Sequence, residues 1–444
     1  MLNSRVLDRS LHLTPLVFFL SFIVAGGVGI IATQSSDDVI GLLLVVVGIS
    51  ILAIYMIPHL AWMEAGSFLP QTLTTGLLLR LGFSMVSLWS SYALYGGLED
   101  AGLYHHYGNV VAQHLWRLEF DQLGPFLNWG TNFIGFFTGV IYAIIGPTLY
   151  GGYLVYAFFA FWGSYFFYRA FSSTFPQGNK LLYAILVFFF PSILYWSNGI
   201  GKDALIFLCI GLFAYGSAQL TRHQLKSLLP LILGFLGVMW IRPHIALVLV
   251  FTLAIAILVR GVGKGATRYF ISIVGLLVVG GLFWFLLPQV AAYVGLKEFS
   301  SQGMLSLLQQ EQGFTFRGGS TFQTVNIFNP LNFPMAAVTI LFRPLPWEAH
   351  NLQALVQSLE GIILISLVLW QLKNLGRAIL SSRSNTYLLF ILVYIIAFIF
   401  LFTNVQNFGT LARERTMMLP FFFMLIAYVP IRTQSNVKPQ EVTI

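Results

Sequence analysis

The run TYLLFILVYIIAFIFLFT at residues 386–403 contains no Asp, Glu, Lys or Arg. Apolar runs of about 17–25 residues are long enough to cross the hydrocarbon core of a bilayer as a helix. Comparable runs recur along the chain, so we predict an all-α polytopic membrane protein with about twelve transmembrane helices (eleven to thirteen). The predicted spans lie at residues 14–33, 40–57, 73–95, 150–168, 181–197, 202–220, 226–241, 244–260, 269–287, 359–372, 386–403 and 417–432.

The overall composition agrees with this fold class. Of the 444 residues, 57% are hydrophobic and 9% are charged, whereas a soluble domain carries roughly 25% charged residues. These values exclude a soluble enzyme, a disordered protein and a nucleic-acid-binding module. The single cysteine, Cys209, lies in an apolar run, which excludes a disulfide framework and a thiolate metal site. We expect residues 1–444 to form one transmembrane domain, with a disordered cytoplasmic tail at 433–444.

The basic residues predict the orientation in the membrane. With a cytoplasmic N-terminus and a re-entrant or juxtamembrane segment at 131–146, fourteen of the 23 basic residues face the cytoplasm, as the positive-inside rule favours. Eight face outward: Arg117, Lys202, Arg242, Lys297, Arg317, Arg343, Arg413 and Arg415. The alternative of thirteen crossings, in which 131–146 spans the membrane, would move the basic clusters at 260–268 and 373–383 outside. We therefore predict a multi-pass protein with both termini cytoplasmic.

Two long segments, 96–130 and 288–358, are predicted to form large outer loops. The first begins with the acidic pair Glu99-Asp100, followed by His105 and His106. Paired acids at a membrane surface can act as a general base for a sugar hydroxyl or can hold a divalent metal ion. Histidines in such a position are more often interfacial than catalytic. Residues 110–118 have the periodicity of a helix lying on the membrane surface.

Several outer cations stand at the ends of predicted helices, where an unpartnered charge beside hydrocarbon is costly. Brought together, they would form a receptor for a phosphate or pyrophosphate, because the arginine fork donates two parallel hydrogen bonds. We expect Arg242, Arg413 and Arg415 to line one cavity, with Lys202 or Arg343 at its edge. The alternative is that each cation neutralises a local carboxylate, since Lys202 adjoins Asp203 and Glu414 separates the last two arginines.

Recognised nucleotide and zinc motifs are missing from the sequence. It contains no Walker A sequence, no GxGxxG after a strand and no HExxH. A pump driven by its own ATPase is therefore not expected.

The order of these features resembles the GT-C superfamily of membrane glycosyltransferases. The acidic pair in the first large outer loop is followed by Tyr104 and a surface helix, and then by an apolar stretch, 133–169, ending in Tyr168-Arg169. The resemblance implies transfer of a sugar from a polyprenyl-phosphate donor on the outer face of the membrane. It also implies that Asp100, or Glu99, occupies the acidic catalytic position.

The later motifs resemble membrane polymerases of O-antigen and exopolysaccharide assembly, in which outer arginines are thought to hold the lipid pyrophosphate. These motifs are Gly201-Lys202-Asp203 after Trp196-Ser197, Arg242-Pro243-His244, Arg343-Pro344 with Pro346-Trp347-Glu348, and Arg413-Glu414-Arg415 before Pro420. The predicted substrate-binding residues are Lys202, Asp203, Arg242, His244, Arg343, Glu348, Arg413, Arg415, His105 and His106.

Together these features predict a glycosyltransferase of the bacterial inner membrane that acts in cell-surface polysaccharide or glycolipid assembly. Its donor would be an undecaprenyl-phosphate- or pyrophosphate-linked sugar, its acceptor a glycan or lipid, and its other partners membrane lipids. The only cofactor considered is a divalent metal ion at Asp100 and Glu99. The alternatives are a polysaccharide polymerase, a transporter or flippase of lipid-linked sugars, and a non-catalytic assembly scaffold.

The orientation gives a first testable prediction. In a protein freed of Cys209, a cysteine at Ser301 should react with a membrane-impermeant thiol reagent in intact cells, while one at Ser382 should be protected. Protection of the first together with labelling of the second would show that the orientation is inverted.

Overall fold

A computed structural model describes residues 36–62, 68–222, 228–260, 265–296, 321–325 and 329–430, together with residues 303, 306 and 313. This part of the chain is helical, and its only β-type pairing is an isolated bridge between Thr321 and Asn407. The predicted span at 14–33 and the predicted tail at 433–444 lie outside the described residues, as do Lys297 and Arg317.

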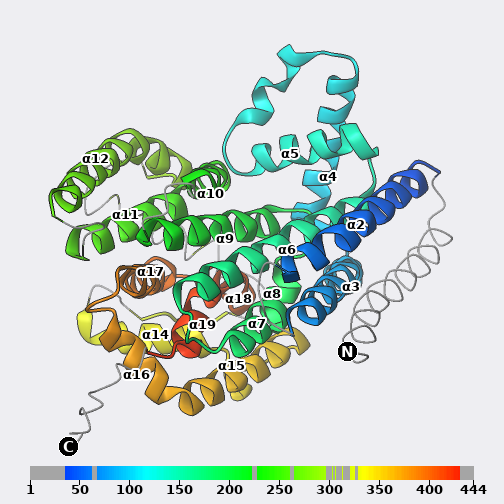
Figure 1. Cartoon of the computed structure of the whole chain (residues 1–444). Helices are drawn as coiled ribbons and strands as arrows, with labels where there is room; N and C mark the ends of the chain where they lie inside the picture. Colours follow the sequence, from blue (N-terminus) through cyan, green and yellow to red (C-terminus); the bar gives the residue numbers. More distant parts are fainter. Residues whose placement is uncertain are drawn as a thin grey trace, which may run out of the picture.

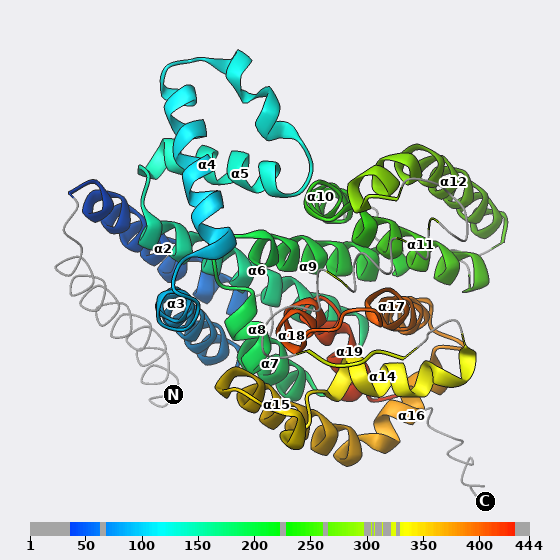
Figure 2. The same ribbon diagram turned by 180° about the vertical axis from the view of Figure 1, so that it is seen from behind.

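The first half of the chain forms a helical core with an appended pair of helices. Figure 1 shows α4 and α5 standing off the bundle, and Figure 2 shows the same arrangement from behind. The elements up to the middle of the chain are α2 (Ser36–Trp62), α3 (Leu69–Tyr95), α4 (Glu99–Trp116), the 3-10 helix η1 (Phe120–Leu127), α5 (Thr131–Ile145), α6 (Leu149–Thr174), α7 (Lys180–Phe189), α8 (Pro191–Trp196) and α9 (Lys202–Thr221).

In the second half of the chain, the last two helices, α18 and α19, lie inside the fold. In both views α18 and α19 lie between the α6 and α9 layer and the helices α14 to α16. These elements are α10 (Leu228–Ile241), α11 (Pro243–Arg260), α12 (Ala266–Val294), η3 (Pro330–Asn332), α14 (Phe333–Phe342), η4 (Pro346–Glu348), α15 (Leu352–Trp370), α16 (Leu372–Ser381), α17 (Thr386–Phe402), α18 (Phe408–Arg415) and α19 (Leu419–Ala427).

Six described helices are long and apolar enough to cross a membrane, and the number rises to eight if each of two bent pairs counts as one span. The six segments are Asp38–Leu60, Leu69–Ala93, Lys202–Thr221, Pro243–Arg260, Ile273–Tyr293 and Leu352–Trp370. Large apolar side chains point outward from them; Leu277 and Trp284 of α12 are 69% and 85% exposed. Surface of this kind is stable in lipid rather than in water. The chain is therefore a helical membrane protein, and the finer count of twelve spans stays a prediction.

Two predicted spans take another form in the structure. The single helix predicted over 181–197 is wrong, because the backbone is extended at Phe190 and a new helix starts at Pro191. Proline disfavours the helical conformation in the residue before it. In the described part of the apolar run at 417–432, which ends at residue 430, the one helix is the short α19, whose nine residues are all buried within the protein. Its hydrophobicity thus reflects packing in the core.

The predicted outer segments are more helical than expected. The surface helix predicted at 110–118 begins at Glu99, so Asp100 lies in the first turn of α4 rather than in a loop. The segment 131–146 forms α5, and the chain bends by 113° between α5 and α6 at Gly146-Pro147. Within 288–358, α12 continues through Pro288 to Val294 and α14 adds a short apolar helix.

Close helix contacts depend on small residues. A Cβ atom added to Gly211 of α9 would lie 2.6 Å from the carbonyl oxygen of Gly163 in α6. Only glycine allows the two backbones to approach this closely, as is common between helices in membranes. This contact holds α9, whose first turn carries Lys202 and Asp203, against α6.

Arg80 of α3 links three parts of the core. Its side chain is fully buried and donates hydrogen bonds to Ser164 Oγ at 2.9 Å, Ser197 Oγ at 2.8 Å and Asn198 Oδ1 at 3.0 Å. Asn198 returns a hydrogen bond to the Arg80 carbonyl oxygen. No carboxylate pairs with Arg80 among the described residues, so neutral oxygens solvate its charge and hold the segment after α8 in place.

This network predicts that Arg80→Ala destabilises the protein. The substitution leaves several buried polar groups without a hydrogen-bond partner, and each such group lowers the stability by about 1–3 kcal/mol. Thermal unfolding in nanodiscs should show a clearly lowered midpoint, while Arg117→Ala, which removes an exposed arginine at the end of α4, should leave the midpoint unchanged. Equal midpoints for the two variants would contradict the role given to Arg80.

Candidate functional site

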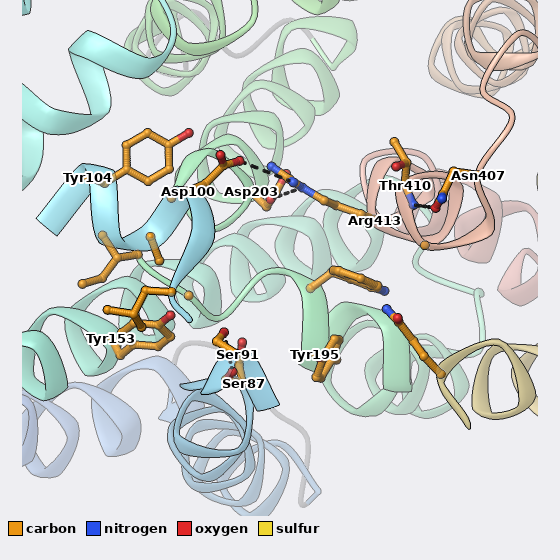
Figure 3. Close-up of a pocket in the computed structure, with 18 of the residues that line it drawn as sticks. Ser87, Ser91, Asp100, Tyr104, Tyr153, Tyr195, Asp203, Asn407, Thr410 and Arg413 are labelled. Carbon is orange, nitrogen blue, oxygen red and sulfur yellow. Dashed lines mark hydrogen bonds and ion pairs between the residues drawn. The ribbon is translucent and has the colours of Figure 1, made fainter. Parts of the chain in front are cut away.

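A polar cavity of about 380 Å³ lies where α3, α4, α6, α8, α9, α15 and α18 meet. Its charged lining residues are Asp100, Asp203 and Arg413. Figure 3 shows both carboxylates pointing toward the Arg413 guanidinium, although the three residues come from three different helices. The tertiary structure thus brings together residues that are far apart in the sequence.

Local structure places the two carboxylates at helix starts. Gly96 ends α3 in the left-handed conformation (φ 72°), and α4 begins three residues later. Asp100 is the second residue of α4, and Asp203 is the second residue of α9. A negative charge in the first turn of a helix is stabilised by the helix dipole.

The two carboxylates differ in their contacts with Arg413. Asp203 accepts a hydrogen bond from Arg413 Nε at 2.6 Å, and its side chain is only 16% exposed. The Asp100 carboxylate lies 3.9 Å from the guanidinium, too far for a hydrogen bond, and is 67% exposed. Asp203 therefore anchors the arginine, whereas Asp100 is open to the cavity.

The ion pairs continue behind the cavity. Arg242, at the junction of α10 and α11, donates to Asp203 Oδ1 at 3.0 Å and also pairs with Glu414. The result is a chain of alternating charges that runs Asp100, Arg413, Asp203, Arg242, Glu414. The Asp203 carboxylate raises the pKa of the Arg413 guanidinium above its ordinary value, so this side chain stays cationic over the physiological range.

The expected convergence of the cations is found only in part. Arg413 lines the cavity, Arg242 contacts it through Asp203, and Lys202 lies among the same charged groups. Arg415 does not join them. It is fully buried, pairs with Glu360 at 3.4 Å and donates to the carbonyl oxygen of Leu341 at 2.9 Å. The two arginines of the Arg413-Glu414-Arg415 motif thus have different roles.

Arg343 and Glu348 form a separate pair. Arg343 Nε donates to Glu348 Oε1 at 2.9 Å, and the guanidinium stacks over the rings of Phe322 and Phe408. Burial opposes ionisation of Glu348, but the hydrogen bonds from Arg343 and from the Leu345 N–H hold its pKa below the ordinary value. Arg343 and Glu348 thus neutralise each other. This agrees with the alternative interpretation, in which each cation pairs with a local carboxylate.

The remaining predicted residues lie outside this cavity. His244 is partly buried with its ring stacked on Tyr293, and His106 is exposed on α4. His105 faces a different cavity and hydrogen-bonds through Nδ1 to the Tyr142 hydroxyl at 2.7 Å. Glu99 is the first residue of α4, and its side chain lies outside the described part of the structure.

Several lining residues were not predicted as site residues from the sequence. They are aromatic or amide side chains: Tyr104, Tyr153, Tyr195, Trp196, Asn351, Gln353 and Asn407. A signal existed for two of them, because Asn351 and Asn407 each precede a helix and cap its N-terminus. Nothing in the sequence indicated that these two helix starts face the same cavity.

The described side chains around Asp100 do not form a metal site. Among the described residues no group of three or more His, Cys, Asp or Glu side chains could hold a metal ion. Asp100 faces the Arg413 guanidinium. The positive charge of the guanidinium already balances the negative charge of the Asp100 carboxylate. The divalent metal ion considered at Asp100 and Glu99 stays a prediction, because the Glu99 side chain lies outside the described residues.

Comparisons with protein-family models, with curated proteins and with solved structures found no match.

The ion-pair chain predicts that Asp203→Asn is strongly destabilising. The substitution leaves Arg242 and Arg413 with one carboxylate fewer, and breaking a buried pair typically costs about 3–5 kcal/mol. Chemical unfolding should report this loss, whereas Asp121→Asn, at an exposed carboxylate of η1, should unfold like the wild type. Unchanged stability of Asp203→Asn would show that the pairing has little energetic weight.

Proposed function

We propose that this protein is a membrane glycosyltransferase that takes a sugar from a polyprenyl-phosphate or polyprenyl-pyrophosphate carrier. The observation that carries the proposal is the pairing of an exposed carboxylate, Asp100, with a guanidinium, Arg413, in one polar cavity. The first is a candidate base, and the second is a candidate phosphate ligand. The GT-C-like architecture, the twelve spans and the location on the outer face of a bacterial inner membrane belong to this proposal.

The lining of the cavity suits a sugar. Tyr195 and Trp196 contribute partly exposed aromatic rings, and Asn351 and Gln353 contribute amide groups. Sugar rings present apolar C–H faces and a rim of hydroxyl groups, so aromatic and amide side chains match both parts. Ligand sites commonly combine apolar walls with a few polar groups that fix the orientation.

In the proposed reaction an acceptor hydroxyl attacks the anomeric carbon of the donor sugar. Asp100 takes the hydroxyl proton, and the bond between the anomeric carbon and the phosphate oxygen breaks. The electron pair of that bond leaves with the phosphate, whose developing charge Arg413 and Lys202 stabilise. Asp203 positions Arg413 for this role because it holds the Nε side of the guanidinium.

A polysaccharide polymerase would use the same groups, and the product distinguishes the two activities. A transferase adds one sugar for each donor, whereas a polymerase joins lipid-linked glycans into a ladder of lengths. The reconstituted protein should therefore be supplied with a panel of radiolabelled polyprenyl-linked sugars, and the products should be separated by size.

The proposal predicts that Asp100→Asn lowers the turnover rate by about 10²–10⁴-fold, the usual effect of removing a general base. Because the side chain is largely exposed and accepts no short hydrogen bond from Arg413, the thermal midpoint should stay near the wild-type value. Asp121→Asn is the matched control and should keep full activity. Near-normal turnover by Asp100→Asn would remove the catalytic role from this residue.

A further inference from the structure

The short helix α16 joins two apolar helices at the edge of the molecule (Figures 1 and 2). The preceding helix, α15, is long and apolar enough to cross a membrane, and the chain bends by 110° between α16 and the apolar helix α17. With ten residues, α16 is too short to cross a hydrocarbon core of about 30 Å. Because it lies nearly perpendicular to α17, which is predicted to cross the bilayer, α16 is oriented along the membrane surface.

Apolar side chains stand out from α16 and from the end of α15. Leu372, Ile379 and Leu380 are 56%, 44% and 61% exposed, and Trp370 is 69% exposed. The helix also contacts α19, and its Ala378 is fully buried. Exposed leucine side chains are stable against lipid rather than water, and tryptophan is enriched at the boundary between membrane and water. These residues therefore place α16 at that boundary.

Three cations accompany this apolar surface. Lys373, Arg377 and Arg383 are exposed, and none of them forms an ion pair within the described part of the chain. Lys373 and Arg377 are four residues apart, so they share one side of α16. Arg377 donates to Asn374 Oδ1 at 3.3 Å, which is a neutral acceptor. Residues 361–413 contain no Asp or Glu, so the sequence around α16 supplies cations without anions.

An anionic phospholipid matches both parts of this surface. Its phosphate accepts charge-assisted hydrogen bonds from lysine and arginine, and its acyl chains cover the exposed leucine side chains. A soluble anion would contact the cations alone. Residues 373–383 are also expected on the cytoplasmic side of the membrane, where anionic lipids give the leaflet a negative surface potential.

We infer that α16 lies in the headgroup layer of the bilayer and binds anionic phospholipids through Lys373, Arg377 and Arg383. Helices with an apolar side and a basic side associate with membranes through the same two contributions, buried apolar area and attraction to anionic lipids. The helix thus fixes the level of the α15 end in the bilayer.

The test uses the full chain, freed of Cys209 and labelled with bimane on a cysteine at the exposed residue Ser384, in phosphatidylcholine nanodiscs. A minority of the lipid is phosphatidylglycerol or phosphatidylcholine with brominated acyl chains, which quench bimane. Brominated phosphatidylglycerol should quench more strongly, because each Lys or Arg near the surface strengthens association with anionic lipid about fivefold. The triple variant Lys373→Gln, Arg377→Gln and Arg383→Gln should lose about tenfold or more of this preference. The matched control Arg222→Gln, which removes an exposed cation at the end of α9, should keep it.

A second variant tests the apolar contact independently of the charges. Leu372→Asn combined with Leu380→Asn should weaken quenching by both lipids, because it removes apolar surface while keeping the three cations. Equal quenching by the two brominated lipids overturns the inference, and so does a preference that persists in the triple variant. Quenching by neither lipid also overturns it, because α16 would then lie outside the bilayer with its cations open to a soluble partner. Loss of the preference on adding inorganic phosphate at constant ionic strength would show that α16 binds free phosphate instead of lipid.

Discussion

The charge of Arg242 is the constraint on which the site depends. It is buried at the junction of two helices, and a buried guanidinium needs carboxylates close by. Asp203 and Glu414 supply them, and Asp203 in turn holds Arg413. This ties the start of α9, the start of α11 and the helix α18 together, and it leaves Asp100 as the one exposed carboxylate of the chain of charges.

The charges of the buried residues Arg80 and Arg415 are stabilised in other ways. Arg80 is surrounded by neutral oxygen atoms, and Arg415 combines Glu360 with backbone carbonyl groups. Both side chains are fully enclosed, and neither lines a cavity described above. The two arginines without solvent access stabilise the core, whereas Arg413, whose side chain is 30% exposed, can contact a ligand. Exposure thus distinguishes structural arginines from a functional candidate.

The helix α4 organises the region where chemistry is proposed. Its first turn carries Asp100 into the cavity that Arg413 lines, and its second turn carries His105 into a separate cavity. The helix α4 thus lies between two cavities that share no lining residue.

The sequence alone determined the class of protein, because its apolar runs are too long and its charges too few for a water-soluble fold. It also singled out Asp100, Asp203 and Arg413, since charges at the ends of apolar helices require an explanation. The tertiary structure decided which of these charges meet. Arg413 and Arg415 are two residues apart, and on a helix that spacing turns their side chains to different sides, so one reaches the cavity and the other Glu360. The break before Pro191 follows from the local restriction that proline places on the residue before it. The burial of α19 depends on packing between distant segments, which hydropathy along the chain does not record.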